Sequence, residues 1–198
     1  EIQQDLVRKM FANNSFRWMG RLFQQTFRFA SSVTKIVDDT LAGYPAGLRI
    51  ALHVRHPRGW AQKGKKEDIT QKDNLALACT KHQIMQHKRH GQVCVLLLAS
   101  DRAATIQSVR QGVAGLCEVI SLPKHVRRDG RSFEHGDWTG LSALQDLYML
   151  SKGNLFIGTW QSTFSIRAAE LFAANSNATS QHIIWYNDGC NWFAPGRL

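Results

Sequence analysis

The stretch QVCVLLLA, residues Gln92–Ala99, decides the fold class of this chain. Every residue from Val93 to Ala99 is apolar, and this is the longest apolar run in the sequence. An uninterrupted run of this length is typical of a strand that is buried on both faces of a parallel sheet. It is too short to cross a bilayer, which takes about 20 apolar residues in a helix.

Strands and helices alternate on both sides of this stretch. The other predicted strands are Leu48–Val54, Leu116–Leu122, Asn154–Gly158 and His182–Tyr186, and the predicted helices are Lys72–His90, Ala103–Val113, one that opens at Thr139, and Thr163–Ala174. Asp73 is a candidate cap for the first of these helices, and the tail Asn187–Leu198 is predicted to be irregular. The alternation predicts an α/β, Rossmann-like parallel sheet with helices on both faces.

A helical segment precedes the sheet. Phe16, Met19, Phe23 and Phe27 recur at helical spacing within residues 1–42, and a turn over Gly43–Gly47 ends this region. We therefore expect residues 1–47 to be a helical lead-in, the end of a domain that precedes this one. Residues 48–198 are expected to form the Rossmann-like domain.

The chain is basic, with 25 Lys and Arg against 15 Asp and Glu among its 198 residues, a formal charge of +10. The excess lies in three clusters, His56–Lys72, Lys81–His90 and Lys124–Arg131. Such a field attracts polyanions, and a set of solvated basic loops is the plainer interpretation. The sequence has neither an RNP-type aromatic strand nor a zinc-finger spacing, so nucleic acid is not the predicted partner.

Four cysteines, Cys79, Cys94, Cys117 and Cys190, are far apart in the sequence and form no CxxC pair. A disulfide scaffold has denser cysteine, so we expect buried thiols or at most one bridge. Cysteine usage therefore leaves the compartment open.

Two loops carry the candidate site. With the common strand order 3-2-1-4-5, the first and fourth strands are neighbours at the point where the order reverses, and ligands bind beyond the carboxyl ends of such strands. His53 and Arg55 leave the first strand on the same face, and Arg offers bidentate donors to phosphate. The fourth strand is followed by Gly158–Ser165, GTWQSTFS, which enters a helix. A helix start with Ser and Thr hydroxyls is an anion site, so the two loops predict a phosphate clamp.

Standard nucleotide motifs are missing from the sequence. It has no GxxxxGK[ST], no GxGxxG after the first strand and no GxSxG, which argues against P-loop, ordinary NAD and α/β-hydrolase sites. It also has no DxD-type metal site, because Asp38-Asp39 lies in a helical stretch near a Lys and is interpreted as surface charge. We therefore expect Arg and the helix dipole to neutralise the phosphate, with no metal and no other cofactor.

These motifs, taken in order, resemble a known family. His53-Val54-Arg55, Ala99-Ser100-Asp101, Asp146 with Leu150-Ser151, Phe156–Thr159 and Ser162–Ser165 resemble the donor-binding half of the GDP-fucose-dependent fucosyltransferases with a GT-B-like fold. This group contains the α1,6-fucosyltransferases and the protein O-fucosyltransferases. The resemblance covers Leu48 to about Phe172 and implies a C-terminal donor domain.

The resemblance implies a role for each matching residue. Arg55 holds the diphosphate and is the catalytic residue; His53 contacts the nucleotide, Asp146 the guanine edge, and Asp101 contributes to donor binding. Ser162, Thr163, Phe164 and Ser165 cradle the phosphate. The sequence departs from the α1,6 pattern twice, with Arg102 in place of a second acid and Pro57–Trp60 in place of Thr-Asp. The residue-level alternatives are a surface Arg55, a core His53, a polar-face Asp146 and an ordinary helix cap at Ser162–Ser165.

The implied activity is transfer of fucose from GDP-fucose to a hydroxyl of a glycan or protein, with inversion and without a metal. No side chain is assigned as the base. The implied location is the Golgi or endoplasmic reticulum lumen in a eukaryote and the cytoplasm otherwise, with membrane attachment only through a segment outside this chain. The alternatives are a non-catalytic nucleotide- or polyanion-binding module and a glycan-binding or regulatory remnant of the enzyme fold.

Overall fold

The computed structural model describes residues 19–25, 28–56, 66–122, 137–160, 162–176 and 182–192. Its sheet has the order β3-β2-β1-β4-β5-β6. The strands are β1 (Leu48–Val54), β2 (Cys94–Ser100), β3 (Glu118–Ile120), β4 (Leu155–Gly158), β5 (Ile183–Trp185) and β6 (Asn191–Trp192). Strands β1 to β5 are parallel, and β6 is antiparallel to β5. The predicted parallel sheet and its 3-2-1-4-5 order are confirmed.

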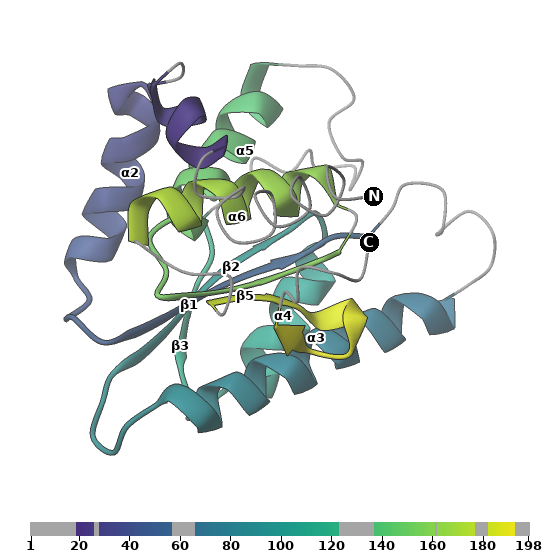
Figure 1. Ribbon diagram of the computed structural model, residues 1–198. Coiled ribbons are helices and arrows are strands. Elements are labelled where there is room, and N and C mark those ends of the chain that lie inside the picture. The colour runs from purple at the N-terminus through teal and green to yellow at the C-terminus, as the bar shows by residue number, and fades with distance from the viewer. Residues whose placement is uncertain are drawn as a thin grey trace, which may run out of the picture.

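Helices cover both faces of the sheet (Figure 1). One face carries α2 (Ser31–Ala42), α5 (Asp137–Leu150) and α6 (Thr163–Ser176), and the other carries α3 (Lys66–His87), α4 (Ala103–Gly112) and the short 3-10 helix η3 (Tyr186–Asp188). A further helical stretch lies at residues 19–25. None of the described helices is both long and apolar enough to span a membrane.

The core explains why the middle of β1 and nearly all of β2 are apolar. Ile50 and Leu52 of β1 pack toward α3 and α4, whereas Ala51 between them packs toward α5 and α6. In β2, Leu96 and Leu98 face the first layer, while Val95 and Leu97 face α2. Because successive side chains of a strand point to opposite faces, a strand between two helical layers has no polar position.

Several element boundaries differ from those predicted. Helix α3 begins at Lys66 rather than Lys72, so Asp73 lies inside the helix and does not cap it. Helix α5 begins at Asp137 rather than Thr139, and β3 is limited to Glu118–Ile120. The tail is not wholly irregular, because Gly189 and Cys190 adopt left-handed backbone angles, with φ of 74° and 59°, and turn the chain back to form β6.

The prediction of at most one disulfide is wrong. Cys79 is bonded to Cys190 and Cys94 to Cys117, with Cα–Cα distances of 5.4 and 4.6 Å. The first bond joins α3 to the turn before β6, and the second joins β2 to the segment that leads into β3. Each bond joins two cysteines that are neighbours in the folded chain but separated in the sequence, by 111 and 23 residues.

Some predicted features lie outside the described residues. These are the first helix over residues 1–18, most of the basic residues of His56–Lys72, the loop that contains Lys124–Arg131, and the segment Pro57–Trp60. Within the described part, α2 packs on the sheet, since Val37 and Leu41 contact the layer that holds Val95 and Leu97.

Candidate functional site

The site begins where β1 and β4 lie side by side in the middle of the sheet. Leu52 of β1 is in register with Ile157 of β4, so the two strands end together and their following loops meet. On one side of this pair the sheet continues to β2 and on the other to β5. This is the reversal point at which open α/β sheets bind ligands.

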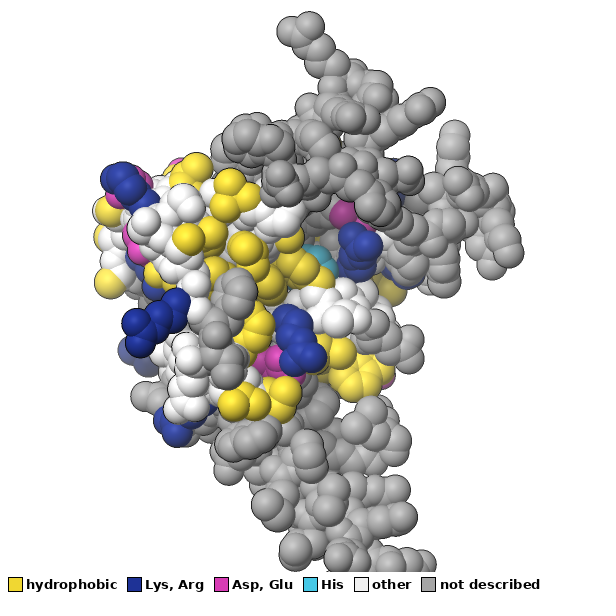
Figure 2. Space-filling view, turned by 90° about the horizontal axis from the view of Figure 1, so that it is seen from above, with side chains coloured by type: hydrophobic (Ala, Val, Ile, Leu, Met, Phe, Trp, Pro, Cys, Tyr) yellow, Lys and Arg dark blue, Asp and Glu magenta, His cyan; other side chains and the backbone are white. Residues whose placement is uncertain are grey.

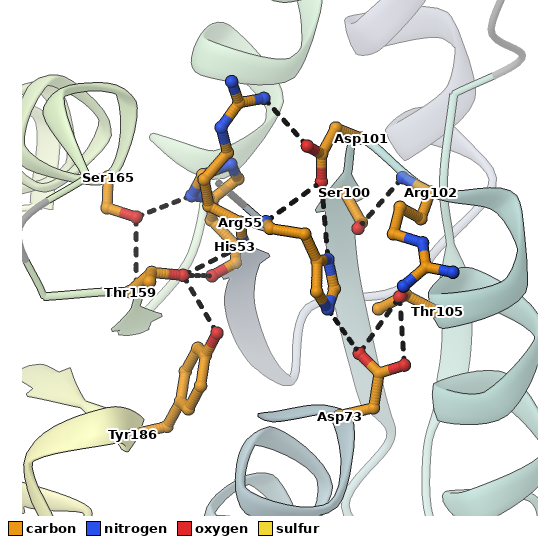
Figure 3. A network of polar contacts seen from close by, with 11 residues as sticks. His53, Arg55, Asp73, Ser100, Asp101, Arg102, Thr105, Thr159, Ser165 and Tyr186 are labelled. Atoms are coloured by element: carbon orange, nitrogen blue, oxygen red, sulfur yellow. Dashed lines mark hydrogen bonds and ion pairs between the residues drawn. The ribbon is translucent and has the colours of Figure 1, made fainter. Parts of the chain in front are cut away.

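Thr159, just after β4, ties the two loops together (Figure 3). Its Oγ1 accepts a hydrogen bond from the backbone N–H of Arg55 at 2.9 Å and donates to the carbonyl oxygen of His53 at 3.1 Å. The same oxygen lies 3.1 Å from Oη of Tyr186. Because a hydroxyl carries one proton and His53 O takes it, Tyr186 is the donor in that contact. Thr159 is buried, so this hydroxyl fixes the backbone of both strand ends.

Tyr186 is suited to act as that donor. Burial raises the pKa of its phenol to about 12. The phenol therefore keeps its proton at neutral pH. Tyr186 connects the strand ends to η3 and, through the turn at Cys190, to α3.

His53 and Ser165 form a buried pair at the start of α6. Nδ1 of His53 lies 2.6 Å from Oγ of Ser165, and the backbone N–H of Thr159 donates to the same oxygen at 3.0 Å. The ring of Phe164 packs against the His53 imidazole with 4.6 Å between centroids. The predicted residues His53, Phe164 and Ser165 are thus brought together, and Ser165 is fully buried.

Ser162 caps the helix that follows. Its Oγ accepts the backbone N–H of Ser165 at 3.3 Å, and its carbonyl oxygen accepts the N–H of Ile166 at 3.0 Å. This is the geometry of an N-cap. The first-turn N–H groups of a helix lack partners within the helix and favour anions there, so Ser162 and Thr163 stand at a position suited to phosphate.

Arg55 extends its side chain toward the end of β2 (Figure 3). Its Nη1 lies 3.0 Å from Oδ2 of Asp101, with the two side chains 38% and 27% exposed. Burial raises the pKa of Asp101, but the hydrogen bond from His56 and the charge of Arg55 outweigh it, so this pKa lies below its ordinary value. The predicted residues Arg55 and Asp101 are therefore a partly exposed ion pair between the ends of β1 and β2.

Asp146 lies on α5 and is buried. Its neighbour Leu147 packs in one cluster with Ala51 of β1 and Phe172 of α6. His53 follows Ala51 by two residues and points to the same face of the sheet. Asp146 and His53 therefore belong to one layer, between the sheet and the α5–α6 pair. The guanine contact expected of Asp146 stays a prediction.

Three residues of this region were not singled out as site residues from the sequence: His56, Asp73 and Tyr186. The His56 ring lies between Asp73 and Asp101, and Thr105 Oγ1 contacts both carboxylate oxygens of Asp73 at 3.0 and 3.1 Å. No local motif links these residues, because their proximity depends on how α3 packs against the sheet.

Basic side chains are dispersed over the face that carries α2, α5 and α6. Figure 2, which looks onto the face of α2, α5 and α6, shows the Lys and Arg side chains at separate points with hydrophobic side chains between them. Among the described residues, no group of three or more His, Cys, Asp or Glu is placed to hold a metal ion.

The sequence matches no protein-family model and no curated protein. Solved structures match its fold. NodZ alpha-1,6-fucosyltransferase soaked with GDP-fucose matches with a TM-score of 0.54 and 20% identity, over 76% of this chain and 45% of that one. Fucosyltransferase NodZ from Bradyrhizobium matches with a TM-score of 0.52 and 21% identity, over 85% of this chain and 48% of that one. POFUT1 in complex with GDP matches with a TM-score of 0.51 and 14% identity, over 80% of this chain and 47% of that one.

The chain has a Rossmann-like fucosyltransferase fold. The resemblance inferred from the sequence is confirmed at the level of the fold. The chain spans about half the length of these solved fucosyltransferases.

Proposed function

We propose that this chain binds GDP-fucose and supplies the donor site for transfer of fucose to a hydroxyl of a glycan or protein. The observation that carries the proposal is the hydrogen bond between Arg55 N–H and Thr159 Oγ1, which holds an Arg and a helix start at one point of the sheet. The fold supports it, because NodZ alpha-1,6-fucosyltransferase soaked with GDP-fucose and POFUT1 in complex with GDP have the same fold.

Arg55 and the start of α6 would share the diphosphate. The guanidinium is 38% exposed and offers five N–H donors, so it can turn to a phosphate in front of it. Ser162 and Thr163 at the first turn of α6 add hydroxyl and backbone N–H donors. Neither contribution needs a metal ion.

Transfer is an inverting substitution. The acceptor oxygen forms a bond to the anomeric carbon while the bond from that carbon to the β-phosphate oxygen breaks, and the electron pair leaves with GDP. Negative charge therefore grows on the β-phosphate, where Arg55 and the α6 dipole stabilise it. The acceptor hydroxyl loses its proton in this reaction, and we assign that proton to no side chain.

The nucleoside would lie toward the layer of α5 and α6. His53 lies beside Phe164 at the base of this layer, and Asp146 belongs to the same layer. A carboxylate suits the guanine edge, which presents an N–H and an NH₂ donor. This arrangement supports guanine over adenine, since adenine lacks that pair of adjacent donors.

The two disulfides support an oxidising compartment, such as the lumen of the endoplasmic reticulum or Golgi. Disulfides persist in such compartments and are rare in the reducing cytosol. Both bonds lie in the domain that carries the proposed site.

A thermal-shift panel tests the proposal. GDP and GDP-fucose should raise the Tm, because a ligand that binds only the folded state stabilises it by RT ln(1 + [L]/Kd), whereas ADP at the same concentration should not. Equal shifts from ADP and GDP would overturn guanine specificity. If GDP has no effect and single-stranded nucleic acid binds with a steep salt dependence, the chain is a polyanion-binding module instead.

A further inference from the structure

A buried histidine, His56, lies next to Asp101 on the interior side of the Arg55–Asp101 ion pair. The side chain of His56 is 6% exposed, and each ring nitrogen faces a carboxylate from a different element. Nε2 lies 3.0 Å from Oδ1 of Asp73 on α3, and Nδ1 lies 3.5 Å from Oδ1 of Asp101 after β2. Figure 3 labels both carboxylates, Asp73 and Asp101. The backbone N–H of His56 also donates to Asp101 Oδ1, at 3.3 Å.

Charges alternate along this series. Successive members lie at ion-pair distance in the order Arg55, Asp101, His56 and Asp73. Thr105 of α4 donates a hydrogen bond to the carboxylate of Asp73. A protonated imidazole carries an N–H on both nitrogens, whereas the neutral ring carries only one. Only the protonated ring therefore offers a donor to each carboxylate.

Asp101 thus has a basic side chain facing each of its two oxygens. Oδ2 faces Arg55 on the more exposed side, and Oδ1 faces His56 on the buried side. Removing one partner of a buried ion pair is costly because it leaves an uncompensated charge. A carboxylate that keeps a second partner avoids most of that cost.

We propose that His56 is a positioning residue that neutralises Asp101 from behind, so that Arg55 can leave Asp101 and bind the donor diphosphate. The inference rests on the proposed function, because Arg55 needs an incoming phosphate. Without His56, Arg55 is the one described basic side chain that pairs with Asp101, and phosphate has to compete with the full strength of that ion pair. His56 acts through Asp101 and Arg55 and need not touch the substrate.

Calorimetric titration with GDP tests this on four proteins: wild type, His56→Asn, Asp101→Asn and the double variant. His56→Asn should weaken GDP binding by about tenfold, within the range of measured coupling between contacting charged residues. The double variant should recover to within about threefold of wild type, because Asp101→Asn removes the charge that retains Arg55. A purely structural role for His56 predicts no such recovery. Asp39→Asn, which removes a carboxylate from the exposed Lys35–Asp39 pair, is the matched control.

Two results would overturn the inference. One is unchanged GDP affinity in His56→Asn, and the other is a double variant that binds GDP no more tightly than His56→Asn alone. If His56→Asn does not fold, as judged by circular dichroism, His56→Gln takes its place with the same expectations. A wild type that does not bind GDP at all contradicts the proposed function instead, so the two failures are distinct.

Discussion

The backbone N–H of Arg55 donates to the hydroxyl of Thr159 at 2.9 Å, although the two residues are 104 positions apart. This bond joins the chain after β1 to the chain after β4. It holds the candidate phosphate-binding Arg beside the N-terminus of α6, and it makes the position of one loop depend on the other.

Replacing Thr159 by Val should destabilise the fold. The change keeps the shape but removes the oxygen that the Arg55 N–H, the His53 carbonyl and the Tyr186 hydroxyl all contact. Buried polar groups left without a partner cost about 1–3 kcal/mol, and we expect a loss of that size in the free energy of unfolding measured with urea. Thr159→Ser keeps the hydroxyl and should lose much less. Equal stability of the Val and Ser variants would contradict the role of this hydroxyl.

Replacing Arg55 by Ala should slow fucose transfer from GDP-fucose. Loss of one charge-stabilising donor typically lowers kcat by about 10²–10³-fold, and a coupled assay for released GDP measures it. Arg89→Ala is the control, since Arg89 is an exposed cation after α3. The proposed role of Arg55 fails if the two variants transfer fucose at the same rate.

The sequence alone predicted most of the sheet. Leu48–Val54 was predicted with the boundaries that β1 has, and the order of β1 to β5 is the common order that the site prediction assumed. Apolar runs and turn residues are local signals, so local patterns suffice for them. The start of α3 was missed because Asp73 has the chemistry of a helix cap, yet it lies inside the helix and pairs with His56.

The parts that sequence could not supply depend on long-range packing. Cys79 and Cys190 are 111 residues apart, and only the turn at Gly189 and Cys190 brings them together. The candidate loops after β1 and β4 were located correctly because strand ends meet at a known point of such sheets. The contact between His56 and Asp73 was not located, because it depends on how α3, which carries Asp73, packs against the sheet.

Acid should destabilise the protein partly through Asp101. Its pKa is lower in the folded state, so between that value and the ordinary pKa near 4 the unfolded chain binds more protons. The stabilisation is present at higher pH and is lost as the pH falls through the folded-state pKa. Unfolding free energy measured from pH 6 to pH 3 should therefore fall less steeply in Asp101→Asn than in wild type. A parallel slope for the two proteins would count against the ion pair.

Reduction should lower the stability of the fold. A bond that closes a loop of about 100 residues contributes about 4.7 kcal/mol in the chain-entropy account, and the Cys79–Cys190 separation is 111. We expect a lower Tm for Cys79→Ala/Cys190→Ala, and a smaller loss for Cys94→Ala/Cys117→Ala, whose separation is 23. Thiol titration of the unfolded, unreduced protein should find no free thiols. Four free thiols would contradict both bonds.

The central claim is that a diphosphate binds between the ends of β1 and β4, and a crystal structure of this chain with GDP tests it most directly. The account predicts the phosphates between the Arg55 guanidinium and the first turn of α6 at Ser162 and Thr163. A complex in which GDP lies elsewhere, with Arg55 still paired to Asp101, would contradict it.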